Sequence, residues 1–521
     1  MAGEGRAARL GEDDAAGGGI EATTAPAGPA PLILEFELPV AAAARLGRAP
    51  FVTAHRQGRS RGSTVETFWH DTAEGTLAAK GLMIEAGRRG PRRLIRTLPG
   101  SAAPWHPARP PELIRDLAAD EAPEEAGGTP LVPLAAFAGR QQALQLAMPE
   151  GVVAAVLIAG RLRSVAAERE GARLRLSGPV AAVLAAARGL AQDLPLLPPR
   201  ACLAEEARAL ATGTAPRPAR LGPPDTSAAG TTEAAFTAAF GHLLEVLCQQ
   251  SARIEPEAGP EPVHQSRVAL RRLRSVFRVF RAAADGPTLR GLDAQFREVL
   301  AVLGPARDWD VFLGGIGRDI AAAFPGERRI QGLLKAARAR RDAAYDAVLA
   351  MLAAPAWRLL LIDATGVLLR QPWRTEGTDG ARALLDAPVR EFARAILDRR
   401  WQRMRRAGAD FEQLSAEALH ELRLDAKRLR YAAEVFAPVL NAKAGRRFLR
   451  RIARLQDGLG IANDAAVARG LAQALAGGGP DRSWAIGVVE GWSEARVADH
   501  RNDAFAAWDR LGGKDRFWTD N

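Results

Sequence analysis

The chain has 521 residues, a formal net charge of +11 and a pI of about 10.6. Its hydrophobic content of 47% and charged content of 25% are ordinary for a soluble globular protein, and its length allows two or three domains. The excess of base favours an acidic partner: a nucleic acid, a membrane surface or a phosphate polymer. Biased codon usage is the plainer alternative, because arginine greatly outnumbers lysine, but it does not explain a net excess of base.

The cysteine content and the N-terminal sequence exclude further classes of protein. Cys202 and Cys248 are the only cysteines, too few for a disulfide framework, and no Cys/His spacing typical of a metal site occurs. The first residues lack the apolar segment of a secretory signal, and no run of about 18 apolar residues predicts a membrane span. We therefore expect a cytoplasmic protein without a membrane partner, and the sequence does not indicate its oligomeric state.

The first part of the chain predicts a tail, a sheet domain and a linker. Residues 1–30 are mostly Gly, Ala, Pro and acidic residues without periodicity, which predicts a disordered tail. Residues 31–210 contain strand-like runs such as PLILEFELP and VVAAVLIAG, and then a helical pattern, PVAAVLAAARGLAQDLP. They predict an α+β domain built mainly on an antiparallel sheet. Residues 211–232, rich in Pro, Gly, Ser and Thr, predict a linker.

From residue 233 onward the pattern is helical. Apolar residues recur at helical spacing with arginine on the other faces, which predicts an all-helical domain over 233–510. Helices are expected at 233–253, 261–284, 288–303, 308–323, 326–353, 388–407, 415–438, 443–458, 462–477 and 482–510. Residues 355–387 are expected to join two halves, about 233–354 and 388–510, and residues 511–521 to form a C-terminal tail.

The helical part contains an internal repeat. VHQSRVALRRLRSVF at 263–277 and LHELRLDAKRLRYAA at 419–433 share a histidine followed by basic residues at the same spacing, 156 positions apart. LGPARDWDV and LGIANDAAV follow at the same offset, which aligns Asp308 with Asp464. The repeat predicts a duplicated helical unit with pseudo-twofold symmetry, each copy placing its basic helix in an equivalent position.

A helical projection at about 100° per residue separates the basic and apolar side chains of both copies. Leu270, Leu273 and Phe277 fall opposite a line of arginines headed by His264, and the second copy behaves alike. Arg272 and Arg428 flank these lines. The candidates for ligand contact are His264, Arg267, Arg271, Arg272, Arg274, Arg278, His420, Arg423, Lys427, Arg428 and Arg430.

A solvated basic face is the ordinary explanation for such a charge run. Ordinary faces mix the two signs, however, whereas residues 264–281 contain many arginines and no acid. Such a line repels itself unless an anion or acidic neighbours, such as Asp308 and Asp464, offset it. Guanidinium forks bind phosphate oxygens in pairs and remain charged, so two such helices suit a linear polyanion.

The residues on these two helices are not those expected of a nucleic-acid-binding surface or of a catalytic site. The basic faces lack the aromatic residues on which single strands stack, with only Tyr431 close to a line. Gln265 is the only amide suited to reading bases. The histidines can hydrogen-bond phosphate or add charge, but neither has a metal partner at i+3 or i+4, and no partner is evident for a catalytic base. We therefore assign no catalytic residue and no metal site here.

These stretches resemble the CHAD domain, a conserved-histidine α-helical domain. The matching pieces are VHQSRVALRRLRSVFRVF, LGPARDWDVF, LHELRLDAKRLRYAAEVF and LQDGLGIANDAAV, and the resemblance covers about residues 233–510. It implies two helical halves around a basic channel that binds inorganic polyphosphate, in some members on polyphosphate granules. It carries a binding role to the candidates above, except Arg272 and Arg278, which rest on the helical projection alone.

The N-terminal domain resembles the CYTH domain, the triphosphate-tunnel fold of class IV adenylyl cyclases and thiamine triphosphatases. LEFELP, TFWHDTAEGTLAAKGLMIE and PVAAVLAAARGLAQDLPLLP carry the resemblance, and CYTH followed by CHAD is a familiar pairing. It implies an antiparallel β tunnel or barrel in which carboxylates hold Mg²⁺ and basic residues hold triphosphate.

Several positions depart from the CYTH pattern. Glu35 and Glu37 keep an opening Glu-x-Glu, but the family's later metal-binding Glu-x-Glu aligns with Arg173 and Arg175. Family lysines align with Pro39, Pro99 and Leu203, and a family Arg-x-Arg with Glu85 and Gly87. Because arginine repels a metal ion, Glu35 and Glu37 remain only weak metal candidates. We expect this domain to be catalytically inactive and to serve as a second anion-binding or docking module.

The leading hypothesis is a polyphosphate-binding protein with no catalytic activity and no cofactor, located in the cytoplasm and associated with polyphosphate granules. One alternative is a Mg²⁺-dependent triphosphatase in the N-terminal domain. The other is a non-specific nucleic-acid binder.

Overall fold

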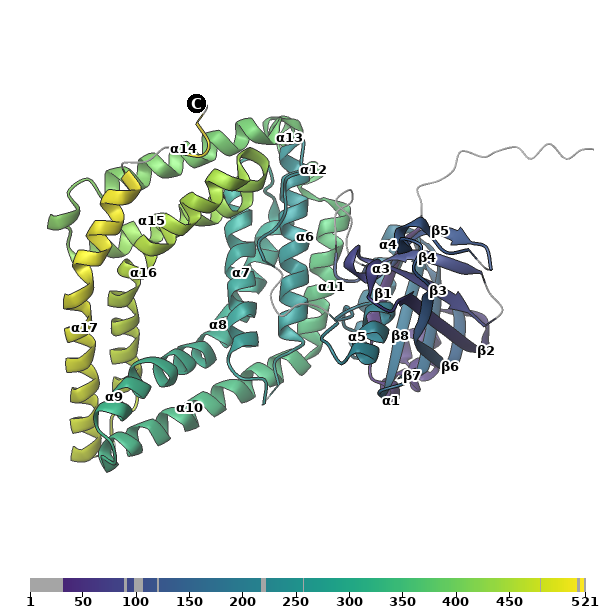
Figure 1. Cartoon of the computed structure of the whole chain (residues 1–521), viewed down its shortest axis with the longest axis horizontal. Helices are drawn as coiled ribbons and strands as arrows, with labels where there is room; N and C mark the ends of the chain where they lie inside the picture. Colours follow the sequence, from purple (N-terminus) through teal and green to yellow (C-terminus); the bar gives the residue numbers. More distant parts are fainter. Residues whose placement is uncertain are drawn as a thin grey trace, which may run out of the picture.

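The computed structural model describes residues 31–88, 91–97, 106–119, 121–216, 222–255, 257–477, 479–512 and 516–519. The predicted disordered tail at 1–30 lies outside these residues. A domain built on a β-sheet lies beside a domain built from helices, and Figure 1 shows the sheet domain next to α11 (Pro355–Arg370).

The N-terminal domain is a curled antiparallel sheet of eight strands in the order β1-β8-β7-β6-β2-β3-β4-β5. The strands are β1 (Leu32–Glu37), β2 (Arg56–Thr72), β3 (Leu82–Gly87), β4 (Arg92–Arg96), β5 (Glu112–Leu117), β6 (Leu131–Met148), β7 (Gly151–Ser164) and β8 (Glu168–Gly178). The outer edge of β1 is partly covered, because the Glu35 amide donates to the Ala108 carbonyl and the Glu37 amide to the Leu197 carbonyl, each at 2.8 Å. The predicted antiparallel sheet is confirmed, as a half-barrel.

Alternation along the strands gives this sheet two packed faces. On β1, Leu34 and Phe36 are buried in a core shared with α4 (Val180–Asp193), the helix predicted in this region. The opposite face packs in part against α5 (Leu203–Thr212). The remaining helices of this domain are α1 (Val40–Ala43), η1 (Leu46–Arg48), α2 (Pro50–His55), α3 (Thr76–Ala79) and η2 (Glu124–Ala126).

The second domain is helical, as predicted. Its elements are α6 (Thr232–Ser251), α7 (Glu261–Phe280), α8 (Pro287–Phe312), η3 (Leu313–Gly317), α9 (Arg318–Ala323), α10 (Arg328–Ala353), α11, α12 (Trp373–Glu376), α13 (Asp379–Asp386), α14 (Val389–Ala407), η4 (Phe411–Gln413), α15 (Ala416–Leu440), α16 (Ala442–Gln473) and α17 (Pro480–Gly512). Several begin at side-chain caps, where the Ser415 hydroxyl and the Asn441 side-chain carbonyl accept from backbone amides of α15 and α16.

Four long helices occur twice in the same order, as α6-α7-α8-α10 and then as α14-α15-α16-α17. Corresponding helices begin 156 positions apart to within four residues, which is the offset of the sequence repeat. The predicted duplication is therefore present in the fold. The two halves meet where α7 contacts α15 and where α10 contacts α17. Together the eight helices form a four-sided frame (Figure 1).

Four segments differ from the sequence-based expectation. Residues 288–303 and 308–312 belong to one helix, α8, and residues 443–458 and 462–473 belong to another, α16. Pro305 and the glycines of the two repeat motifs, Gly304 and Gly460, lie inside these helices and do not end them. The predicted joining segment 355–387 contains three helices. Within the predicted C-terminal tail, Phe517 and Trp518 are buried and pack on the helical core.

The joining segment forms the contact between the domains. α11 packs on α4, and Ile362 of α11 belongs to the core of the sheet domain. The Arg188 guanidinium donates to the Asp363 carboxylate at 3.0 Å across this contact. The segment therefore does more than join the two helical halves, because it also packs the helical domain against the sheet domain.

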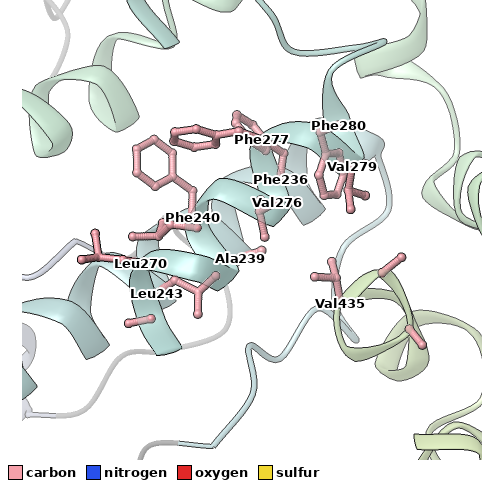
Figure 2. Close-up of a cluster of buried hydrophobic side chains, with 14 of the residues drawn as sticks. Phe236, Ala239, Phe240, Leu243, Leu270, Val276, Phe277, Val279, Phe280 and Val435 are labelled. Atoms are coloured by element: carbon pink, nitrogen blue, oxygen red, sulfur yellow. The ribbon is translucent and has the colours of Figure 1, made fainter. Parts of the chain in front are cut away.

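Aromatic packing joins α6 and α7. Phe236 and Phe240 of α6 meet Phe277 and Phe280 of α7, and the Phe240 and Phe277 rings lie edge to face with centroids 5.1 Å apart. Figure 2 shows this cluster with Val435 of α15 beside it. One face of α7 is thereby committed to the core, and its polar face is turned away from it.

No single helix among the described residues has both the length and the apolar character to cross a membrane, and only the bent pair α10 and α11, meeting at 58°, passes on those two criteria together.

The apolar face of α7 should set the stability of the helical domain. Leu273 is fully buried, so Leu273→Ala should lower the unfolding free energy by about 2–5 kcal/mol. Exposed Arg281, which follows the last residue of α7, pairs with Asp285 at 3.6 Å, so Arg281→Ala should change the unfolding free energy by less than about 1 kcal/mol. Urea unfolding followed by circular dichroism measures both. Equal effects would contradict this assignment of faces.

Candidate basic site of the helical domain

The basic and apolar faces of α7 and α15 are separated as the helical projection predicts. Leu270 and Leu273 of α7 and Leu422 and Leu429 of α15 are fully buried. The basic residues opposite them are partly buried or exposed, and Arg271 is exposed. The helices therefore use one side for the core and leave a cationic side available to a ligand.

An arginine–aspartate contact recurs in both halves at equivalent positions. Arg267 of α7 lies 3.7 Å from Asp308 of α8, and Arg423 of α15 lies 4.0 Å from Asp464 of α16. Each pair is the other displaced by 156 positions. The repeated Asp of the LGPARD and LGIAND motifs thus holds the first arginine of each basic line, as the sequence suggested for acidic neighbours.

The glycine of each motif explains a second shared feature. A Cβ atom on Gly304 would come within 3.1 Å of Arg267 Nη1, and one on Gly460 within 3.5 Å of Arg423 Nη2. A side chain at Gly304 would require a small shift of the Arg267 guanidinium, whereas one at Gly460 would meet Arg423 at an ordinary van der Waals distance. Both glycines thus lie against the first arginine of a basic line, inside continuous helices that they do not end.

The two basic faces lie near each other across the pseudo-twofold axis. The charge of Arg271 acts on both Arg423 and Lys427, and the Asp308 and Asp464 carboxylates also act on one another. We call Arg267, Arg271, Arg423 and Lys427 the central cluster. It contains groups from both halves, which the sequence could suggest only by analogy.

The central cluster is under electrostatic strain. Burial lowers the pKa values of Arg267 and Arg423, and the charge of Arg271 lowers both further. Burial, followed by the charges of Arg423 and Arg271, lowers the pKa of Lys427 to about 8. Burial raises the pKa of Asp308 against the opposing effect of Arg267. A bound anion would relieve the repulsion and favour the charged lysine.

Other predicted residues are held by carboxylates of the protein itself. Asp293 binds Arg274 through two hydrogen bonds, at 2.7 and 3.2 Å. Glu434 accepts a hydrogen bond from Arg430 Nε at 3.0 Å and forms an ion pair with Arg272 at 2.9 Å. Asp425 contacts Arg428 at 2.6 Å and Arg403 of α14 at 3.0 Å. These carboxylates position the arginines and reduce their availability to a ligand. Arg278 is exposed and, within the described parts of the chain, makes no ion pair.

The two repeat histidines occupy the first turns of α7 and α15, with His264 half-buried and His420 exposed. No group of three or more potential ligands among the described His, Cys, Asp and Glu residues could hold a metal ion. The binding role of the histidines stays a prediction.

Sequence reasoning missed several basic residues of this region, among them Arg307 and Arg400. Arg307 precedes Asp308 in the LGPARD motif, and its charge acts on Arg267. Arg400 lies on α14, and its charge interacts with those of Arg278 and Arg428. The repeat alignment contained a signal for Arg400, because Leu244 stands at the equivalent position of α6.

The weak metal candidates of the sheet domain are occupied by arginine. Strand pairing aligns Glu35 with Arg175 and Glu37 with Arg173. Arg175 Nη2 lies 2.8 Å from Glu35 Oε2, and Arg173 Nη2 lies 3.6 Å from Glu37 Oε2 and 2.8 Å from Glu206 of α5. Burial raises the pKa of Glu37. These residues do not fit a divalent cation, since each carboxylate already has a cationic partner.

The same face of the sheet is filled with apolar groups. Trp69, Met83 and Phe137 are buried there, and the Trp69 indole donates to Glu85 at 3.2 Å. Glu85 occupies a position where the resemblance calls for arginine, and burial raises its pKa. Leu203 begins α5, whereas Pro99 lies outside the described residues.

A comparison with protein-family models matches residues 238–473 to the CHAD domain. The crystal structure of the CHAD domain from the plant Ricinus communis is 30% identical, with 58% of this chain and 98% of that chain covered and a TM-score of 0.47. PptA from Streptomyces chartreusis is 17% identical, with 55% and 100% covered and a TM-score of 0.40.

The putative adenylyl cyclase HpAC1 from Hippeastrum, described as having a dominant triphosphatase activity, is 13% identical, with 29% of this chain and 80% of that chain covered and a TM-score of 0.19. No curated protein matches the chain.

The pKa of Lys427 can be measured directly, because the chain has only five lysines. One lysine ¹³Cε resonance should titrate with a midpoint of about 8, well below the ordinary value of about 10.4. It should be missing from the Lys427→Met variant. A lysine spectrum in which every resonance titrates near the ordinary value would contradict the desolvated central cluster.

Proposed function

Because this chain belongs to the CHAD domain family, we propose that its helical domain binds inorganic polyphosphate between the basic faces of α7 and α15. The observation that carries the proposal is the central cluster, in which Arg271 interacts with Arg423 and Lys427 of the other half. Two basic helices from separate halves contribute to one cationic region, which suits a ligand with many charges.

The spacing of the basic residues suits a linear polymer of phosphates. Arg267, Arg271, Arg274 and Arg278 recur at three- or four-residue intervals, which places them roughly 4.5–6 Å apart along the helix axis. Guanidinium forks bond phosphate oxygens in pairs and remain charged at any working pH. A polyanion with a negative charge on every unit can meet successive forks without presenting any other recognisable group.

The energetics of the cluster also favour an anionic ligand. Partial burial and mutual repulsion disfavour the charged forms of Lys427, Arg423 and Arg267 in the free protein. Phosphate bound among them replaces repulsion by charge-assisted hydrogen bonds. Binding should therefore be accompanied by proton uptake at Lys427 near pH 8, where this lysine is partly deprotonated.

A nucleic acid is a less suitable ligand for these faces. Stacking of bases on aromatic rings adds about 1–3 kcal/mol per base in single-strand binders, and the basic faces carry only Tyr431 near Arg423. Polyphosphate needs no such surface. If polyphosphate is the ligand, we expect the protein to be located in the cytoplasm at polyphosphate granules.

The sheet domain is proposed to have no catalytic part in this function. The ion pairs Arg175–Glu35 and Arg173–Glu206 neutralise the groups that a triphosphatase would use. Its contact with α11 suggests that it serves as a support or docking module for the helical domain.

Binding should discriminate between polyanions. Long-chain polyphosphate should bind more tightly than single-stranded DNA of similar charge, and log affinity should fall linearly with log salt, at roughly 0.7–0.9 per neutralised phosphate. Replacing His264, Arg271, His420 and Lys427 together with Ala should lower the affinity for polyphosphate at least about a hundredfold, since two charge-assisted contacts are each worth about 1.5–3 kcal/mol. Fluorescence anisotropy with labelled polymers measures both.

Arg338→Ala/Arg340→Ala is the matched control, because it removes two basic side chains from exposed positions on α10, as the fourfold variant removes Arg271 and Lys427. Its affinity should match that of the wild type, and circular dichroism confirms that each variant is folded. Equal or tighter binding of DNA would refute the preference for polyphosphate. An unchanged affinity of the fourfold variant would refute the site.

The sheet domain should not hydrolyse triphosphate. The full-length chain with tripolyphosphate and Mg²⁺ or Mn²⁺ should release no phosphate above the background of a Glu35→Ala/Glu37→Ala variant, because arginine occupies both carboxylates. Colorimetric phosphate assay measures this. Metal-dependent release that disappears in the variant would establish the triphosphatase alternative.

A further inference from the structure

The pseudo-twofold symmetry is broken at the far end of the basic lines. At one end of the contact between α7 and α15, Glu434 of α15 ion-pairs with Arg272 of α7 and with Arg430 of its own helix. The equivalent of Glu434, 156 positions earlier, is Arg278, and the equivalent of Arg272, 156 positions later, is Arg428. Where one end has a carboxylate between two arginines, the related end thus has Arg278 facing Arg428. The charges of these two arginines act on one another.

Further arginines surround this second location. Arg400 of α14 donates through Nη1 to the Arg428 carbonyl, which anchors its guanidinium beside α15. Arg400 also interacts with Arg278, and Arg297 of α8 interacts with Arg278. We call Arg278, Arg297, Arg400 and Arg428 the junction cluster. It draws on α7, α8, α14 and α15.

The nearby carboxylates do not neutralise the junction cluster. Asp293 is engaged with Arg274 through two hydrogen bonds, and Asp425 is shared between Arg428 and Arg403. Arg278 and Arg297 have no ion-pair partner among the described residues, and both are exposed. An excess of positive charge is therefore left accessible at this junction.

Helix α14 also differs in charge from its equivalent in the other half, helix α6. Arg400 and Arg403 replace Leu244 and Leu247 of the equivalent helix α6, and both leucines are buried in the helical core. The same side of the duplicated helix is apolar in one half and basic in the other. Burial and the charges of Arg428 and Arg278 lower the pKa of Arg400 to about 10, so the arginines of this cluster repel one another, as those of the central cluster do.

We propose that the junction cluster is a second phosphate subsite, which extends the polyphosphate track from the central cluster in one direction only. This inference rests on the proposed function and specifies the chain length that the site prefers. Arg271 and Arg278 are seven residues apart on α7, or about 10 Å along the axis. A long chain can place several phosphates at each cluster, whereas tripolyphosphate has only three phosphates to divide between them.

The proposal is tested with two variants of the full-length chain. Arg400→Leu introduces the residue of the equivalent position in α6. Arg278→Glu introduces the residue of the equivalent position in α15, where it can pair with Arg428 as Glu434 pairs with Arg272. Each should reduce the preference for long-chain polyphosphate over tripolyphosphate at least about tenfold, the equivalent of one lost charge-assisted contact. Isothermal titration calorimetry with the two polymers measures this ratio.

The controls separate this inference from the proposed function. Arg340→Glu makes the charge change of Arg278→Glu at an exposed position of α10 and should leave the ratio unchanged. If both junction variants keep the wild-type ratio while the fourfold central variant loses binding, the second subsite is refuted and the proposed function stands. An equal loss for both polymers also refutes the extension. If the fourfold variant still binds, the proposed function itself fails. Because the two junction changes are chemically different, misfolding of one leaves the other as the test.

Discussion

The contact between α7 and α15 is the constraint on which the rest of this protein depends. It brings together two helices whose buried sides are Leu and Phe and whose other sides carry arginine, so apolar packing holds like charges near each other. Burial of a full-sized apolar side chain contributes about 1.5–3 kcal/mol, and many such residues oppose the repulsion. The core can therefore maintain a cationic region that would not assemble by itself.

The carboxylates around this region decide which arginines serve structure and which remain for a ligand. Asp293, Asp425 and Glu434 each engage arginines of the basic lines, and these contacts orient guanidinium groups and limit the net charge. Where a carboxylate has no equivalent in the other half, the balance changes. A duplicated fold can thus carry two unlike ends, because a single exchange of Glu434 for an arginine reverses the local charge while the helices keep their packing.

In the sheet domain, too, the pairing of carboxylates with arginines decides whether charges are available to a ligand, but there the charges pair with each other. The strand register places Glu35 beside Arg175 and Glu37 beside Arg173, so charges that could have held a metal ion and a triphosphate pair with one another. An internally paired set of charges stabilises a fold and offers little to a charged ligand. Among the described residues, Arg278 and Arg297 of the helical domain have no ion-pair partner, whereas Glu35 and Glu37 of the sheet domain each contact an arginine. This contrast is why we assign ligand binding to the helices.

Side-chain periodicity predicted features that a single helix determines, such as which of its side chains are buried. It did not predict contacts that depend on how two helices pack together. The buried Leu273 and the exposed Arg271 follow from the 3.6-residue repeat alone, and the duplication follows from the 156-residue offset. The continuity of α8 through Pro305 was not predicted, because helix-breaking propensity is weaker than the packing of a long helix between two neighbours. The pairing of Glu434 with Arg272 requires the crossing of α7 and α15, which no local pattern specifies. Ion pairs between residues of different helices therefore cannot be predicted from the sequence pattern and require the three-dimensional structure. They also decide whether an arginine is part of the scaffold or part of the site.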